Sequence, residues 1–281
     1  MKKMTVFKKI LVPIDFSSCS LDALKYAIGV ADTFNAKITI VHIYPIPAVG
    51  DTTFFMDKSM LETIEKRIRV EFKIIEHYNT ALKKKPVEYV VKMGFVVNDM
   101  LEVIREQRID LIVMGTKGTS NKLQDIFGST TLEVIQKADC PVVVIPENTK
   151  NQVIKKVAFA ADFQQKNIDG PLKKAKQFAK QYGAQMKIIH VGKGVMSHEE
   201  IDKRNKILAT VEKGIKTIEN TYDYIHDPDV VEGIENYIKS ERIDLIVLTP
   251  HRYNLLERLF KESVTRKLAL HSQIPLLAIP E

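Results

Sequence analysis

Residues 108–113 read Arg-Ile-Asp-Leu-Ile-Val, and residues 242–247 repeat these six residues in the same order, at an offset of 134 (242 − 108). The same offset aligns the segment CPVVVIPE, residues 140–147, with IPLLAIPE, residues 274–281. Nearer the start of each copy, residues 13–16 (PIDF) align with residues 160–163 (AADF). A period this long indicates a duplicated domain rather than a solenoid, because each copy is large enough to hold its own core.

Length and composition agree with a duplication. The chain has 281 residues, which corresponds to two domains at roughly 150 residues each. The polar stretch 147–152 is the predicted linker, so we expect one domain over residues 1–147 and a second over 148–281. No apolar run approaches the roughly 18 residues of a membrane span, and the N-terminus lacks a signal-peptide core. We therefore expect a cytoplasmic protein that does not enter membranes.

Short apolar runs alternate with helical patterns in each copy. In the first copy, the predicted strands are 10–14, 37–43, 87–91, 111–114 and 142–145, and the predicted helices are 21–34, 58–84, 98–108 and 131–138. The strand runs are apolar throughout, which is typical of a parallel sheet covered on both faces. The alternation predicts an open, doubly wound α/β fold. Each copy is expected to form a five-stranded parallel sheet, ordered 3-2-1-4-5, with helices on both faces.

One loop of the first copy carries a candidate anion site. The strand ending at Met114 runs into Gly115 and Gly118, and Gly128-Ser129-Thr130 opens the next helix. Glycine lets the backbone approach a phosphate or take positive φ, and a helix N-terminus favours an anion through its free N–H groups and its dipole. The alternative is structural: the glycines form a turn, and Ser129 and Thr130 only cap the helix, with Glu133 completing a capping box with Thr130.

The position of this loop favours a ligand. It follows the fourth strand, and Asp15 follows the first strand; in the order 3-2-1-4-5 these two carboxyl ends adjoin at the switch point where ligands bind. Asp15 has a simpler alternative role as the acceptor in a turn. His42 and His190 end the second strand of each copy, and we expect backbone groups to satisfy them because no partner is spaced to form a metal site.

The chain resembles the universal stress protein family in its tandem two-domain form. The family signature G-x2-G-x9-G-(S/T) is matched without a gap by Gly115, Gly118, Gly128 and Ser129, and the opening PIDFS at residues 13–17 also matches. The resemblance implies an ATP site in the first domain. Its residues would be Asp15 toward the adenine or ribose, Ile43 against the adenine, Met114 and Gly115 along the ribose and first phosphates, and Gly118, Gly128, Ser129 and Thr130 around the triphosphate.

The resemblance also bears on metals and on assembly. Mg²⁺ would accompany the phosphates and be held mainly by them and by water, so no metal-ligating residue is assigned. The last strands of the two copies would otherwise leave unpaired edges. The family resemblance implies that they meet and form an internal pseudo-dimer. No sequence feature establishes whether two chains associate further as a homodimer.

The second copy departs from the signature. At the offset of 134, the three glycines are replaced by Thr249, Arg252 and Glu262. Side chains would stand where phosphates approach, and Glu262 would repel them. We predict that the second domain does not bind ATP in the family manner. It is either a structural partner that has lost its site, or it holds a different anion near His251 and Arg252.

A binding or regulatory role fits these motifs better than an enzyme. Neither a Ser-His-Asp grouping nor a Walker lysine motif is visible, so no catalytic residue is assigned and phosphoryl transfer is not indicated. The net charge of +7 suits an anionic ligand, but aromatic residues do not interleave with the lysines as in a nucleic-acid surface. We expect an ATP-sensing stress-response protein that is read by an unidentified protein partner. The alternatives are a slow ATPase, an adenylyl- or phosphoryl-transferring enzyme, or a scaffold that does not depend on nucleotide.

Overall fold

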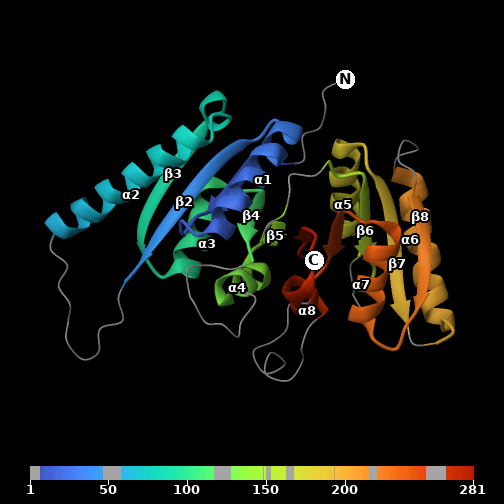
Figure 1. Ribbon diagram of the computed structural model, residues 1–281. Coiled ribbons are helices and arrows are strands. Elements are labelled where there is room, and N and C mark those ends of the chain that lie inside the picture. The colour runs from blue at the N-terminus through green and yellow to red at the C-terminus, as the bar shows by residue number, and fades with distance from the viewer. Residues whose placement is uncertain are drawn as a thin grey trace, which may run out of the picture.

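A single ten-stranded sheet runs through the computed structural model (Figure 1), in the order β3-β2-β1-β4-β5-β10-β9-β6-β7-β8. The structure describes residues 7–46, 58–116, 128–147, 149, 153–162, 168–192, 194–214, 220–250 and 264–281. The first half contributes β1 (Lys9–Pro13), β2 (Lys37–Pro45), β3 (Val87–Gly94), β4 (Leu111–Gly115) and β5 (Val142–Ile145). The second half contributes β6 (Lys156–Ala160), β7 (Gln185–Gly192), β8 (Asn220–His226), β9 (Leu245–Leu248) and β10 (Leu276–Ala278).

Within each half all strands are parallel. When the strands of each half are numbered from the first strand of that half, both halves have the order 3-2-1-4-5. The predicted fold class is therefore confirmed. Strands β4 and β5 are fully buried, since helices cover both of their faces, and this explains why their sequences are apolar throughout rather than alternating.

Helices cover the sheet in two layers. The helices are α1 (Ser18–Phe34), α2 (Lys58–Tyr78), a 3-10 helix (Leu82–Lys84), α3 (Val96–Gln107), α4 (Ser129–Lys137), α5 (Asp169–Tyr182), α6 (His198–Gly214), α7 (Val230–Glu241) and α8 (Val264–His271). Buried residues of α1, α2 and α5 share one hydrophobic cluster with the sheet, and those of α3, α4, α7 and α8 share the other. Both clusters include residues of both halves, so each layer is continuous across the molecule.

Two kinds of helix boundary differ from the prediction. The helix expected over 58–84 ends at Tyr78 and is followed by the 3-10 helix, with the side-chain amide of Asn79 donating to the carbonyl of Ile75 at 2.9 Å beside the backbone bond to the same carbonyl. Helices α1 and α4 begin earlier than expected, at Ser18 and Ser129. Their first turns are rich in small polar residues, which apolar periodicity does not detect.

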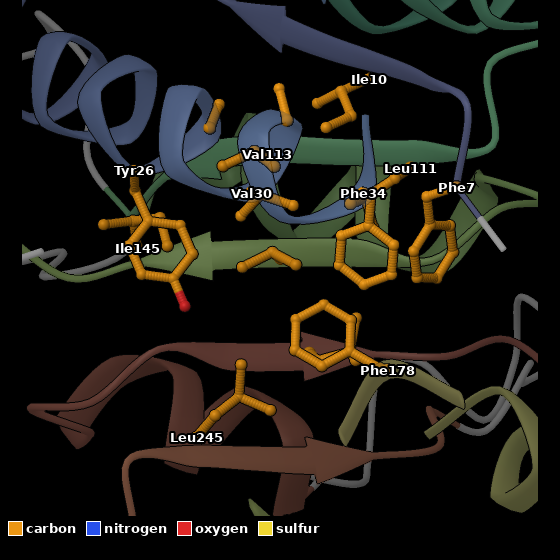
Figure 2. Close-up of a cluster of buried hydrophobic side chains, with 14 of the residues drawn as sticks. Phe7, Ile10, Tyr26, Val30, Phe34, Leu111, Val113, Ile145, Phe178 and Leu245 are labelled. Atoms are coloured by element: carbon orange, nitrogen blue, oxygen red, sulfur yellow. The ribbon is translucent and has the colours of Figure 1, made fainter. Parts of the chain in front are cut away.

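The two halves join through their last strands. Strand β10 pairs antiparallel with β5, with Leu277 opposite Val143, and this confirms the expected pairing. Beside this seam, Phe178 of α5 faces Phe34 and Phe7 of the first half (Figure 2), with ring centroids 5.4 and 6.2 Å away. The halves therefore share a packed core as well as a sheet.

Candidate functional site

A cavity of about 290 Å³ opens at the carboxyl ends of β1, β2 and β4, beside the first turns of α1, α3 and α4. Strands β1 and β4 are direct neighbours there, as the switch-point argument predicts. Seven of the predicted site residues line this one cavity, namely Asp15, Ile43, Met114, Gly115, Gly128, Ser129 and Thr130. Gly118 lies outside the described residues.

The cavity has an apolar side and a polar side. Ile43 and Met114 are 7% and 4% exposed, and they face the cavity together with Val96 and Met100 of α3. On the polar side lie Gly128-Ser129-Thr130 at the start of α4. The first N–H groups of a helix have no partner within it and carry the positive end of its dipole. The arrangement can therefore hold a ligand that combines a flat apolar group with an anion.

Asp15 and His42 occupy the ends of adjacent strands. The carboxylate of Asp15 accepts hydrogen bonds from the backbone N–H and the hydroxyl of Ser17, at 3.1 and 2.6 Å. Asp15 is thus a turn acceptor, and it also lines the cavity. Nδ1 of His42 lies 2.7 Å from the carbonyl oxygen of Ile14, and Nδ1 of His190 lies 2.8 Å from that of Ala161. The expectation that backbone groups satisfy both histidines is confirmed.

Gly115 ends β4 in close contact with two helices. A Cβ atom on Gly115 would lie 2.7 Å from Sγ of Cys19 and 2.9 Å from its carbonyl oxygen. Among the described glycines only Gly183 has a positive φ, so Gly115 is required here by close approach rather than by backbone conformation. Its carbonyl oxygen accepts a hydrogen bond from the hydroxyl of Thr131 at 3.0 Å.

The predicted capping box at α4 is wrong. Helix α4 begins at Ser129, so its N-cap is Gly128, which offers no side chain. Thr130 therefore lies inside the first turn, and Glu133 forms an ion pair with Lys137 one turn later. The N–H of Thr131 donates to the carbonyl of Gly128 at 3.1 Å, and no capping side chain takes the N–H groups of Ser129 and Thr130 before it.

Nine residues line the cavity but were not predicted as site residues. They are Pro13, Ile14, Ser20, Val41, His42, Pro45, Val96, Met100 and Thr131. Ser20 follows Ser17 by three residues, and its backbone N–H donates to the Ser17 hydroxyl at 3.2 Å. The preference of serine for the N-cap position is the signal that could have placed this helix start at Ser17. The approach of α3 to the end of β2 depends on tertiary packing and left no local signal.

Comparison with known proteins places this geometry in a family. The model of the Universal stress protein family matches residues 7–146 and again residues 154–280. The chain belongs to the universal stress protein family. It is a tandem member, because the family model matches each half separately.

Two relatives and one solved structure illustrate the match. A universal stress protein of Methanocaldococcus jannaschii is 30% identical over 151 residues, which cover 52% of this chain and 85% of the relative. One from Thermus aquaticus is 31% identical, over 50% of this chain and 99% of the relative. The crystal structure of a universal stress protein from Archaeoglobus fulgidus is similar in fold, with a TM-score of 0.76, 19% identity, and coverage of 97% of this chain and 96% of that one.

The second half of this universal stress protein differs at the equivalent place. Thr249 follows β9 where Gly115 ends β4, and it is 6% exposed. Arg252 and Glu262, which replace the other two glycines, lie outside the described residues. The absence of ATP binding in this half stays a prediction.

The described residues offer neither a metal cluster nor a membrane-spanning helix. No group of three or more His, Cys, Asp or Glu side chains lies close enough there to hold a metal ion. None of the helices in the described part of the chain is long and apolar enough to cross a membrane.

Replacing Thr131 by valine tests the link between α4 and β4. The variant keeps the side-chain shape but removes the donor to the buried carbonyl of Gly115, which should lower the free energy of unfolding by about 1–3 kcal/mol. Urea denaturation measures this loss. The matched control is Thr63→Val, whose hydroxyl donates to the carbonyl of Ser59 at 2.8 Å on the exposed face of α2; an equal loss in both variants would contradict the assigned contact.

Proposed function

We propose that the first half of this universal stress protein binds ATP in the cavity at the carboxyl ends of β1 and β4, and that this binding is regulatory rather than catalytic. The observation that supports the proposal is the convergence of seven residues, all predicted from the sequence and its family resemblance, on one cavity. They come from four separate segments of the first half, so sequence proximity alone does not explain the grouping.

The two sides of the cavity suggest how ATP would lie. The adenine would occupy the apolar side, against Ile43 and Met114, with Asp15 toward the base or ribose. The phosphates would lie toward Gly128, Ser129 and Thr130, where the N-terminus of α4 favours negative charge. Gly118 would complete the phosphate contacts.

A Mg²⁺ ion would fit this site only with the phosphates. No described carboxylate cluster offers it a protein cage, and Mg²⁺ commonly keeps several waters beside substrate phosphates. When bound, the ion would neutralise phosphate charge. We assign no protein ligand to it.

Equilibrium dialysis with radiolabelled ATP and Mg²⁺ tests the proposal, using full-length protein freed of bound nucleotide. We expect wild type to retain ATP and Gly118→Asp to lose it while keeping its circular dichroism spectrum. Release of ADP or AMP is followed in the same samples. Turnover by wild type above the variant's level would replace the regulatory role by an enzymatic one, and no retention by wild type would reject the site.

A further inference from the structure

The first turn of α1 is packed against the end of β4 more tightly than a side chain would allow. The space for a Cβ on Gly115 is filled by Sγ, the carbonyl oxygen and the carbonyl carbon of Cys19, at 2.7, 2.9 and 3.0 Å. Real Cβ atoms essentially never come this close to other atoms, and two of the three neighbours are backbone atoms. A side chain at position 115 would therefore displace the turn as a whole.

Cys19 is held in this place by contacts on its other sides. It is 3% exposed, and its Sγ lies 3.6 Å from the hydroxyl of Thr116 and 3.8 Å from the carbonyl oxygen of Ile145. Thr116 also accepts a hydrogen bond from the N–H of Gly128 at 2.7 Å. The first turn of α1, the end of β4 and the start of α4 are thus joined at the cavity.

We infer that Gly115 and Cys19 are positioning residues for the nucleotide site. The missing side chain of Gly115 admits the first turn of α1, and Cys19 fills the space, so that Ser20 of this turn lines the cavity. The first glycine of the signature, Gly115, then allows α1 to pack against the end of β4 as well as leaving room for a ligand. That the cavity binds a nucleotide rests on the proposed function, but the contact between Gly115 and Cys19 can be tested without nucleotide.

The experiment measures how fast Cys19 reacts with a thiol reagent in nucleotide-free, full-length protein. Cys140 is replaced by alanine throughout, so that Cys19 is the only thiol. We expect Gly115→Ala to open the first turn and raise the labelling rate about tenfold or more, because buried thiols react through local opening. The same variant should bind ATP about tenfold more weakly, since an open turn must be ordered again on binding.

Two control variants separate this effect from general consequences of the substitutions. Gly29→Ala adds a Cβ to α1 where nothing lies within 4 Å, and it should change neither the labelling rate nor the affinity. Phe178→Ala lowers stability at the other end of α1, where it contacts Phe34; it should leave the affinity unchanged and raise the labelling rate much less than Gly115→Ala does, because the first turn stays in place.

The outcomes distinguish this inference from the proposed function. If Gly115→Ala leaves Cys19 protected, the glycine does not position the turn and the inference is overturned, whether or not ATP binds. If wild type binds no ATP but the labelling rate rises, the contact stands and the proposed function fails. Should Gly115→Ala not fold, hydrogen exchange of residues 18–21 in Cys19→Leu, which enlarges the opposite side of the contact, must show faster exchange than wild type or the inference is wrong.

Discussion

Gly128→Glu is expected to weaken ATP binding about a hundredfold or more while the protein stays folded. The substitution introduces the residue type that the second half has at the equivalent position, Glu262. Gly128 is the N-cap of α4 with φ −65° and ψ 134°, a conformation open to any residue. A carboxylate there would stand beside the phosphates, and two like charges about 4 Å apart repel by about 4 kcal/mol at an effective dielectric constant of about 20.

Gly128→Gln is the matched control for charge. It has the same size as the glutamate but no charge, so it should weaken binding much less, and the gap between the two variants should narrow at high salt. Competition against a fluorescent ATP analogue measures both affinities. Equal affinities for the two variants would show that charge at the α4 N-terminus does not matter and that the phosphates lie elsewhere.

Phe178→Ala should lower the free energy of unfolding by about 3–5 kcal/mol, the usual range for removing a buried aromatic ring. Phe178 is fully buried and packs on Phe34, Phe7 and Tyr182, with ring centroids 5.4, 6.2 and 5.1 Å away. It belongs to the layer that crosses between the halves (Figure 2). Its loss leaves a cavity beside the seam formed by β5 and β10.

The comparison for this variant is Phe95→Ala, because Phe95 is 71% exposed. Its removal should change the unfolding free energy by no more than about 0.5 kcal/mol. Urea denaturation gives both values. If both substitutions lower the free energy of unfolding by the same amount, the aromatic packing between the halves does not contribute to stability. The halves would then be held together by the strand pairing alone.

The duplication and the doubly wound fold class were predictable because both follow from long, regular patterns in the sequence. The repeat at residues 108–113 and 242–247 fixes the number of copies, and continuous apolar strands indicate a sheet covered on both faces. The pairing of β5 with β10 was expected only from the family resemblance. The division between residues 147 and 148 stays a prediction.

Local chemistry was harder to predict than topology. The prediction of a capping box at Thr130 and Glu133 was wrong because the N-cap of α4 is Gly128, which has no side chain. The contact between Gly115 and Cys19 joins residues 96 positions apart (115 − 19), and a glycine in a loop does not reveal which neighbour fills the space of its missing side chain. Met100 reaches the cavity only because α3 packs against β2, which no local pattern encodes.

Isothermal titration calorimetry of the full chain with ATP and Mg²⁺, after removal of any bound nucleotide, tests the central claim most directly. We predict one ATP per chain, with the heat of binding lost in Gly128→Glu. Two ATP per chain would show that the second half binds despite Thr249, Arg252 and Glu262. An absence of binding would contradict the assignment of the cavity to a nucleotide.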